Sequence, residues 1–235
     1  MVGCPMTEFD DYAPDYADKI NRGIHFSGKD HRFFTQLKAD VLLEALGPLA
    51  QSGKLPDVLD VGCGTGAVHP LLAPGVNSVT GVDVSRASLD IAAAENPGNS
   101  YQEYEGGRLP FADGRFDAAI AICVVHHVPP AERATFFQEL RRVVRVGGRI
   151  LVIEHNPFNP LTLYVVNTCE LDRNAVLVSA VGLRRLLAAA NLTRPTVSYF
   201  TFLPFRNRLS SLVDRIFRPL PLGAQYLAVS EKDSD

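Results

Sequence analysis

Residues 58–66 of this 235-residue chain read VLDVGCGTG, and this stretch decides the fold. Its first four residues form a short, mostly apolar run typical of a buried strand, and glycines at positions 62, 64 and 66 then end the run. Glycine lets a backbone approach a ligand closely, and the helix after such a turn presents unpaired N–H groups to an anion. The stretch therefore predicts a strand, a glycine-rich turn and a helix, the start of a nucleotide-binding α/β fold.

Downstream of this turn, short apolar runs alternate with helical patterns. Ser85 is the expected N-cap of a helix over residues 86–95, and the pair Gly147-Gly148 is expected to end a second helix around residues 136–144. This alternation predicts a parallel sheet with helices on both faces. The expected strands of this part span residues 58–61, 79–84, 116–125 and 149–154.

The composition is that of an ordinary globular protein. Lysine and arginine number 23 against 26 aspartates and glutamates, which gives a net charge of −3, and 46% of the residues are hydrophobic. These values argue against disorder, collagen, a coiled coil or a histone-like basic protein. At about 150 residues per domain, the length fits one or two domains.

The four cysteines lie far apart, with no CxxC pair and no His/Cys cluster at zinc spacing, so no metal site is predicted. We interpret them as reduced thiols of a reducing compartment. The first residues are acidic and lack the pattern of a signal peptide, and the longest apolar stretch, residues 118–128, is shorter than the ~18 residues of a spanning helix. We therefore expect a soluble, cytoplasmic protein.

Asp83 ends the second expected strand, 17 residues after Gly66. In dinucleotide folds an acidic side chain at this place accepts hydrogen bonds from the hydroxyls of a ribose. Together with the glycine turn, it predicts a site for an adenosine-type ligand. The spacing of Gly62, Gly64 and Ala67 would also fit a nicotinamide or flavin site.

Five motifs together resemble the class I S-adenosylmethionine-dependent methyltransferases, in particular their small-molecule, type 11 subgroup. The resemblance runs over about residues 55–155, and weakly over residues 9–17, where DDYAPDYA is similar to the family's A-x-x-Y segment. It implies a Rossmann-like, doubly wound, seven-stranded, mostly parallel sheet in a single domain with a helical cap. The motifs are DVGCGTG (60–66), GVDVS (81–85), EGGRLPFADGRFD (105–117), VVHHV (124–128) and LRRVVRVGGRILVIE (140–154).

The family's plan also divides the chain. Residues 1–50 would form an N-terminal helical lid and residues 51–235 the methyltransferase core, with residues 155–180 as a cap insertion over the acceptor. Residues 196–230 would hold an antiparallel pair of strands, expected at 196–203 and 225–229. Between these strands, residues 206–217 predict an amphipathic helix, which could also simply cap the sheet.

The resemblance implies S-adenosyl-L-methionine as the cofactor. In the family the glycine turn lies against the methionyl part of the cofactor, and the acidic residue before it, here Asp60, reaches the amino group. The acid that ends the second strand, Asp83, binds the ribose, with Val84 against the adenine. The positions of the turn implied in this contact are Gly62, Cys63, Gly64 and Gly66.

Further positions complete the implied cofactor site. Glu105 and Gly106 would reach the adenine amino group; the family often has Asp where this chain has Glu105, and the longer side chain should still reach. Cys123 would contact the cofactor near its methyl-bearing end. Tyr12 and Tyr16 could close over the cofactor as the family's N-terminal lid does, or pack as ordinary aromatic residues of a helix.

His126 and His127 follow the fourth strand, at the edge of the sheet where chemistry occurs, and histidine transfers protons near neutral pH. In sugar-modifying relatives a histidine at this place lies beside the acceptor, and His127 is the better match to such a general base. The alternative is that the pair packs and caps this turn. In the polar cluster Glu154-His155-Asn156, His155 is a second candidate base, or else a residue that orders its loop.

Arginine is concentrated in residues 184–218, which contain seven arginines and one acid. This region predicts a solvated surface, or a docking face for a phosphate-bearing acceptor or an anionic membrane surface. The net charge is negative and no RNA-binding module is visible, so no nucleic-acid partner is expected. The motif N/D-P-P-Y/F is absent after the fourth strand, which argues against methylation of adenine in DNA.

The predicted function is that of an enzyme that moves a methyl group from S-adenosylmethionine to an oxygen or nitrogen of a small molecule or glycoconjugate. The alternative is a non-catalytic sensor or assembly protein that binds S-adenosylmethionine, and a screen for turnover separates the two. A third hypothesis, a nicotinamide oxidoreductase, would need a substrate domain that this chain lacks.

Overall fold

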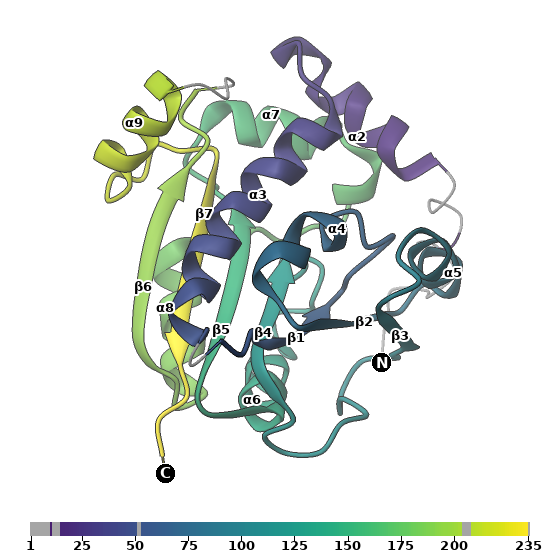
Figure 1. The fold of residues 1–235 in the computed structure, drawn as a ribbon. Helices are drawn as coiled ribbons and strands as arrows, with labels where there is room; N and C mark the ends of the chain where they lie inside the picture. Colours follow the sequence, from purple (N-terminus) through teal and green to yellow (C-terminus); the bar gives the residue numbers. More distant parts are fainter. Residues whose placement is uncertain (1–9, 11–14, 51–52, 204–207, 235) are drawn as a thin grey trace.

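The computed structural model describes residues 10, 15–50, 53–203 and 208–234 (Figure 1). Its centre is a seven-stranded sheet of order β3-β2-β1-β4-β5-β7-β6. Strands β1 to β5 run parallel, and β7 is antiparallel to both of its neighbours. The predicted Rossmann-like, mostly parallel sheet in a single α/β domain is therefore confirmed. The strands are β1 (Asp57–Val61), β2 (Ser78–Asp83), β3 (Ser100–Glu103), β4 (Phe116–Ile122), β5 (Val144–His155), β6 (Thr193–Phe200) and β7 (Gln225–Glu231).

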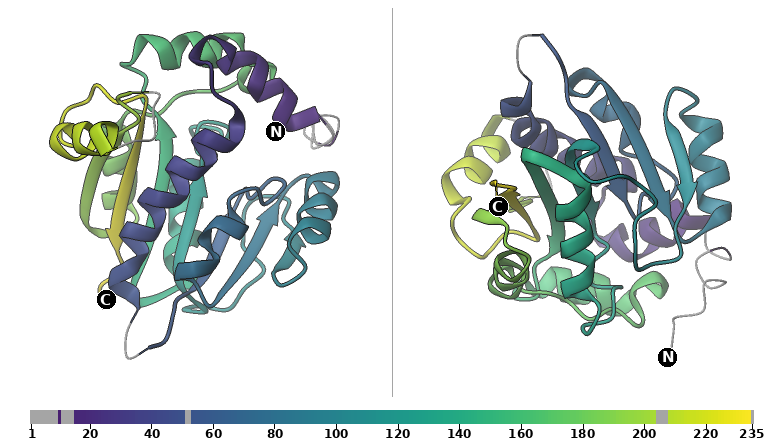
Figure 2. Two further views of the ribbon diagram at one scale, coloured as in Figure 1. Left: turned by 45° about the horizontal axis from the view of Figure 1, so that its top comes forward. Right: turned by 90° about the horizontal axis from the view of Figure 1, so that it is seen from below.

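Helices cover both faces of the sheet (Figure 2). On one face Leu42 of α3 and Leu72 of α4 share a buried core with residues of the central strands. On the other face Phe137 of α6 and Leu187 of α8 do the same. The helices are α2 (Tyr16–Ile24), α3 (His31–Leu46), α4 (His69–Leu72), α5 (Arg86–Glu95), α6 (Arg133–Val143), α7 (Pro160–Thr168), α8 (Ala180–Ala189) and α9 (Arg208–Phe217).

The strand order reverses at β1, which lies between β2 and β4 in the sheet. From β1 the chain runs outward to β2 and β3 and then crosses to β4 on the other side of β1. In open α/β sheets this reversal leaves a crevice at the carboxyl ends of the strands, where ligands bind. Helices α2 and α7 lie across this end of the sheet, at the top of Figure 1, so the fold encloses a site there.

The glycine pair near the start of β5 does not act as predicted. Helix α6 ends at Val143, and Gly147-Gly148 lie inside β5, which begins at Val144. The register between β4 and β5 shifts at this point, and a Cβ on Gly148 would lie 2.6 Å from the carbonyl oxygen of Asp117. The glycines are therefore needed for close approach of the two strands at an irregularity, which periodicity does not reveal.

Two elements have no counterpart among the predicted ones. β3 is a four-residue edge strand whose residues are mostly exposed, so it lacks the apolar run that marks a strand. α8 begins after Ser179, whose side chain accepts a hydrogen bond from the backbone N–H of Gly182 as an N-cap. By contrast, α5 spans residues 86–95 as predicted, and Ser85 caps it by accepting from the N–H of Ser88.

Helix α9 lies against β6 at the edge of the sheet. The predicted apolar stripe is divided between its two sides: Leu209, Leu212 and Ile216 are exposed, whereas Val213 lies partly buried. The helix therefore does lie against the edge of the sheet, but three residues of its apolar stripe do not take part in that contact. Among the described residues, no helix combines the length and the apolar character needed to cross a lipid bilayer.

Candidate active site

A cavity of about 860 Å³ opens at the carboxyl ends of β1, β2, β4 and β5. Residues of α2, α3 and α7 close it from above, among them Ile24, Lys38 and Val165. Its volume lies in the range of about 300–1,000 Å³ that is usual for ligand pockets. The cavity reaches from the glycine turn at one end to a group of histidines at the other.

The glycine turn forms the first wall. Gly62 and Gly64 line the cavity and have φ values of 77° and 51°, which favour glycine. A Cβ on Gly62 would lie 2.4 Å from Cγ2 of Val124, whereas a Cβ on Gly64 would meet nothing within 4 Å. The turn is held against β2 because the N–H groups of Gly62 and Cys63 both donate to the carbonyl oxygen of Val82, at 2.7 and 3.1 Å.

Asp83 stands at the end of β2, beside this turn. One carboxylate oxygen accepts from the N–H of Gly64 at 2.7 Å, and the other accepts from the N–H of Ser85 at 2.9 Å. Burial raises the pKa of this carboxyl, and the hydrogen bonds from Ser85 and Gly64 act in the opposite direction. Both Asp83 and Val84 line the cavity, so the structure brings these two predicted positions together with the turn.

The loop after β3 supplies the next wall. Tyr104, Glu105, Gly106 and Gly107 line the cavity. Gly106 and Gly107 have φ values of 89° and 75°, and the hydroxyl of Tyr104 donates to the carbonyl oxygen of Gly107 at 2.9 Å. The predicted pair of Glu105 and Gly106 therefore lies at the same end of the cavity as Asp83.

Three predicted cofactor positions lie behind this surface and are absent from the cavity lining. Asp60 is buried, and its Oδ2 lies 3.0 Å from Nε2 of His69. The thiol of Cys63 faces Gly81, and burial raises its pKa. Gly66 lies against His69, since a Cβ there would be 2.9 Å from the ring nitrogen Nδ1. His69, which also contacts the hydroxyl of Tyr101 at 2.7 Å, was not identified from the motif.

These residues fit an adenosyl ligand. The other oxygen of Asp60, Oδ1, is buried and has no hydrogen-bond partner, and a buried unpaired acceptor is costly unless a donor reaches it. Gly64 and Gly106 leave open space where a side chain would stand. Asp83 adds a partly buried carboxylate at the position of a ribose acceptor. The cofactor end therefore combines the Asp83 carboxylate with a backbone that a ligand can approach, and the unpaired Asp60 oxygen lies directly behind this surface.

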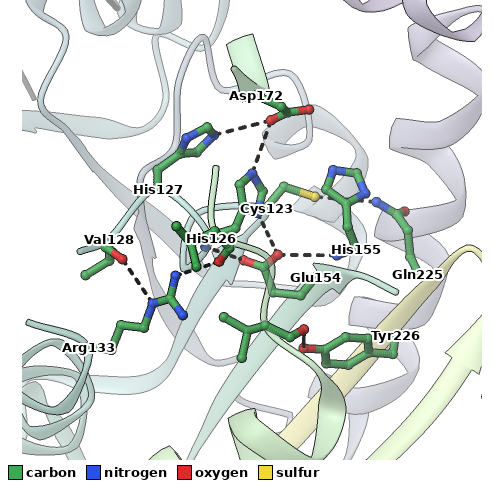
Figure 3. A network of polar contacts seen from close by, with 12 residues as sticks. Cys123, His126, His127, Val128, Arg133, Glu154, His155, Asp172, Gln225 and Tyr226 are labelled. Atoms are coloured by element: carbon green, nitrogen blue, oxygen red, sulfur yellow. Dashed lines mark hydrogen bonds and ion pairs between the residues drawn. The ribbon is translucent and has the colours of Figure 1, made fainter. Parts of the chain in front are cut away.

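The far end of the cavity is a cluster of titratable side chains (Figure 3). Nδ1 of His126 lies 2.6 Å from a carboxylate oxygen of Glu154, and its Nε2 lies 3.3 Å from Oδ1 of Asp172. Nε2 of His127 lies 3.6 Å from the same Asp172 oxygen. The rings of His126 and His155 are 5.3 Å apart. Both predicted catalytic histidines, His127 and His155, line the cavity, and His126 lies between them.

The two adjacent histidines have opposite charge states. For His126, burial lowers the pKa, but the Glu154 carboxylate, with Asp172, outweighs burial and raises it to about 10. For His127, burial and the neighbouring His126 charge lower the pKa to about 4. At neutral pH the cluster therefore holds a charged His126 between two carboxylates and a neutral His127 at the cavity wall.

Cys123 follows the last residue of β4 and has a φ of 57°, a conformation that non-glycine residues seldom adopt. Its sulfur lies 3.4 Å from the side-chain nitrogen of Gln225. Burial would raise the pKa of this thiol, but Lys38 and His155 lower it to about 7. Cys123 lines the cavity between the glycine turn and the histidines.

Asp172 was missed from the sequence because it comes from a short 3₁₀ helix, η5 (Glu170–Asp172), far from the motifs. Within the described residues, the ring nitrogens of His126 and His127 and the Asp172 carboxylate lie within 4.8 Å of one another, a spacing at which a metal ion could be held.

Asn156 is buried and donates to the carbonyl oxygens of Pro221 and Gly223, so it orders a loop. Tyr16 begins α2, and Tyr12 lies outside the described residues.

A family model described as "Methyltransferase domain" matches residues 59–152 of the chain. This match covers the glycine turn, Asp83 and the two adjacent histidines. Residues 59–152 therefore contain a methyltransferase domain. The predicted resemblance to class I S-adenosylmethionine-dependent methyltransferases and the predicted cofactor are thereby confirmed, and the glycine turn is that of a methyltransferase domain rather than of a nicotinamide enzyme.

Individual methyltransferases agree with this assignment. "O-methyltransferase resE" of Aspergillus sclerotiorum is 34% identical over 127 residues, which are 51% of this chain and 47% of that protein. "Probable 18S rRNA (guanine-N(7))-methyltransferase" of Dictyostelium discoideum is 31% identical over 124 residues, 48% of this chain and 43% of that protein. The chain thus spans about half the length of the curated relatives it matches.

Structural similarity to known methyltransferases covers more of the chain than sequence similarity does. A solved structure from Thermotoga maritima, described as a "SAM-dependent methyltransferase, possible histamine N-methyltransferase", superposes with a TM-score of 0.68 at 18% identity. The superposition covers 96% of this chain and 98% of that one. The shared fold therefore extends beyond the residues that the family model matches.

Proposed function

We propose that this protein is a methyltransferase that transfers the methyl group of S-adenosylmethionine to an oxygen or nitrogen of a small molecule or glycoconjugate. The observation that carries the proposal is the continuity of one cavity, which contains both Asp83 and His127. A protein that only sensed the cofactor would need the first end of this cavity and have no use for the second.

S-adenosylmethionine, when bound, supplies an electrophilic methyl group on a sulfonium, which leaves as a neutral thioether. The protein's task is to align the acceptor, and such positioning lowers a barrier by ~7–11 kcal/mol. An acceptor hydroxyl or ammonium must also lose a proton. Neutral His127 can take that proton, and the Asp172 carboxylate, 3.6 Å away, stabilises the charge that results.

The acceptor is proposed to be small because α2, α3 and α7 close over the cavity. Apolar side chains of these helices, such as Ile24, Leu161 and Val165, share the lining with the histidines. A lining of apolar side chains and histidines suits a molecule that is largely apolar or aromatic and presents one reactive hydroxyl or amine. One relative is named for an rRNA base, so an RNA fragment belongs in the acceptor screen as the opposing case.

Thermal unfolding with S-adenosylhomocysteine, S-adenosylmethionine and NADH in parallel tests the cofactor site. A ligand at 100 times its dissociation constant adds ~2.7 kcal/mol of stability, so the adenosyl ligands should raise the Tm by several degrees. NADH should have no effect. An acceptor screen that follows release of S-adenosylhomocysteine then separates an enzyme from a sensor, since a sensor would show the Tm shift without turnover.

The proposed base is tested with His127→Gln, matched by His25→Gln at an exposed histidine outside the cavity lining. Loss of a general base should lower kcat by about 10²–10⁴-fold, with affinity for S-adenosylhomocysteine retained. His25→Gln should be without effect. If instead a chelator abolished turnover and Mn²⁺ restored it, the cluster of His126, His127 and Asp172 would be a metal centre and His127 would not be the base.

A further inference from the structure

Helix α9 turns an apolar side away from the protein. Leu209, Leu212 and Ile216 follow one another at i, i+3 and i+7, and they are 64%, 51% and 59% exposed. The side toward the protein carries Ser210, which is buried, and Asp214, which is half-buried. A helix that only covered the edge of the sheet would show the reverse arrangement, with its leucines inside.

The exposed apolar side of α9 continues onto the start of α7. After α9 the chain carries exposed Leu220 and Leu222, and the residues before and within α7 carry exposed Phe158 and Leu161. These two segments are joined, because the side-chain amide of Asn159 donates to the carbonyl oxygen of Leu222 at 2.8 Å. Together they form one apolar surface, made of Leu209, Leu212, Ile216, Leu220, Leu222, Phe158 and Leu161.

This apolar surface borders the cavity. Leu161 contributes both to the surface and to the cavity lining, and Phe202, which lines the cavity, contacts the ring of Phe217 at the end of α9, with 6.0 Å between centroids. In Figure 1, α9 and α7 lie at the same end of the molecule, above the carboxyl ends of the parallel strands. A layer that covered the apolar surface would therefore lie next to the opening through which an acceptor enters.

The charges that α9 turns outward are positive. Residues 208–222 contain three arginines and one acid, and one of the arginines, Arg218, is paired with Glu44 of α3. Arg208 and Arg215 are exposed on α9, and the acid, Asp214, is turned inward, where it accepts a hydrogen bond from the N–H of Phe202 at 3.0 Å. Exposed leucines flanked by outward-facing arginines are the composition of a helix that lies in a membrane interface.

We propose that the apolar surface docks on an anionic lipid bilayer. Exposed apolar side chains that gather in neighbouring segments mark interaction sites on monomeric proteins. The arginines are complementary to phosphate headgroups, and the leucines reach the acyl boundary when α9 lies flat in the interface. The inference stands apart from the proposed methyl transfer, since it uses none of the residues assigned to the chemistry.

Sedimentation with vesicles tests the proposal. The full chain should bind vesicles of phosphatidylcholine with phosphatidylglycerol and bind pure phosphatidylcholine weakly. The variant L209S/L212S/I216S should lose at least about tenfold in partition coefficient. The variant R208Q/R215Q should lose about fivefold per arginine on the anionic vesicles, and high salt should reproduce that loss.

The matched control is V146S/V181S, which removes two exposed apolar side chains outside the apolar surface and should bind vesicles as the wild type does. A Tm shift with S-adenosylhomocysteine shows that each variant is folded. Equal sedimentation of the triple variant and the wild type would overturn the proposal. A dimer in analytical ultracentrifugation that the triple variant dissociates would also overturn it, because a second copy would then cover the surface.

Discussion

The two ends of the cavity are formed by different chemical groups. At the cofactor end, backbone groups dominate: Gly62 and Gly64 leave space, and Asp83 is held by two N–H groups of adjoining turns. At the acceptor end, side chains dominate, and His126 is fixed by carboxylates on both sides of its ring. The first end depends on turn geometry and the second on charge balance.

This difference teaches which changes each end can tolerate. The turns at the cofactor end are fixed by the sheet, since the N–H of Gly62 donates to a carbonyl oxygen of β2. The charge of His126 depends first on Glu154 of β5 and then on Asp172, which η5 supplies from outside the sheet. A change in the cap can therefore alter the acceptor chemistry while the cofactor end keeps its geometry.

The largest effect on ligand binding is expected from Asp83→Ala. It removes the ribose acceptor and leaves the N–H groups of Gly64 and Ser85 without their partner, and a hydrogen bond to a charged group contributes about 1.5–3 kcal/mol. Affinity for S-adenosylhomocysteine, measured by calorimetry, should fall at least about a hundredfold. Asp90→Ala, an exposed acid of α5, is the control and should bind normally; unchanged affinity in Asp83→Ala would refute the assignment.

Substituting the two cavity-lining glycines separates ligand contact from folding. Both have positive φ, so both alanine variants carry the same kind of backbone strain, about 1–2 kcal/mol. Only Gly62→Ala also clashes, with Val124. Gly62→Ala should lower the Tm by several degrees more than Gly64→Ala, whereas Gly64→Ala should weaken ligand binding at a smaller cost in Tm. Equal Tm losses would show that the clash relaxes.

A smaller effect with a defined pH dependence is expected at His126. The carboxylates raise its pKa from 6.5 to about 10, so the stabilisation is fully present below pH 6.5 and is lost as the pH rises through 10. His126→Gln should therefore lower the Tm by several degrees at pH 6, and the difference from the wild type should shrink by pH 10. A difference that stays constant with pH would mean that His126 is not charged in the folded protein.

The smallest effect is expected at the contact between lid and cap. Lys19 of α2 and Glu170 of η5 form an ion pair of 2.7 Å, with the glutamate side chain 48% exposed. Such surface pairs contribute about 0–1 kcal/mol, so Lys19→Ala should change the Tm by no more than about 2 °C. A larger loss, measured by calorimetry at low salt, would show that the acceptor end depends on this contact to hold Asp172 in place.

Local signals predicted most of the cofactor end. The strand before the glycine turn, the acid that ends β2 and the Ser85 cap all depend on residues close together in sequence, so periodicity and capping rules apply to them. Asp172 could not be predicted in this way, because only the folded cap brings it to His126. The same holds for α9. The helical period identifies an apolar and a polar face, but it does not say which of the two packs against the protein.

Cys123 gives the cavity a built-in chemical reporter. Of the cysteines that the structure describes, Cys63 and Cys169 have thiols whose pKa burial raises, whereas the pKa of Cys123 is lowered to about 7. Since the thiolate is the form that attacks an alkylating reagent, a small maleimide added near neutral pH should modify Cys123 ahead of the other two. The labelling rate at one sulfur atom would then read out the fraction of protein molecules whose cavity is filled, without any radioactive cofactor and before an acceptor is known.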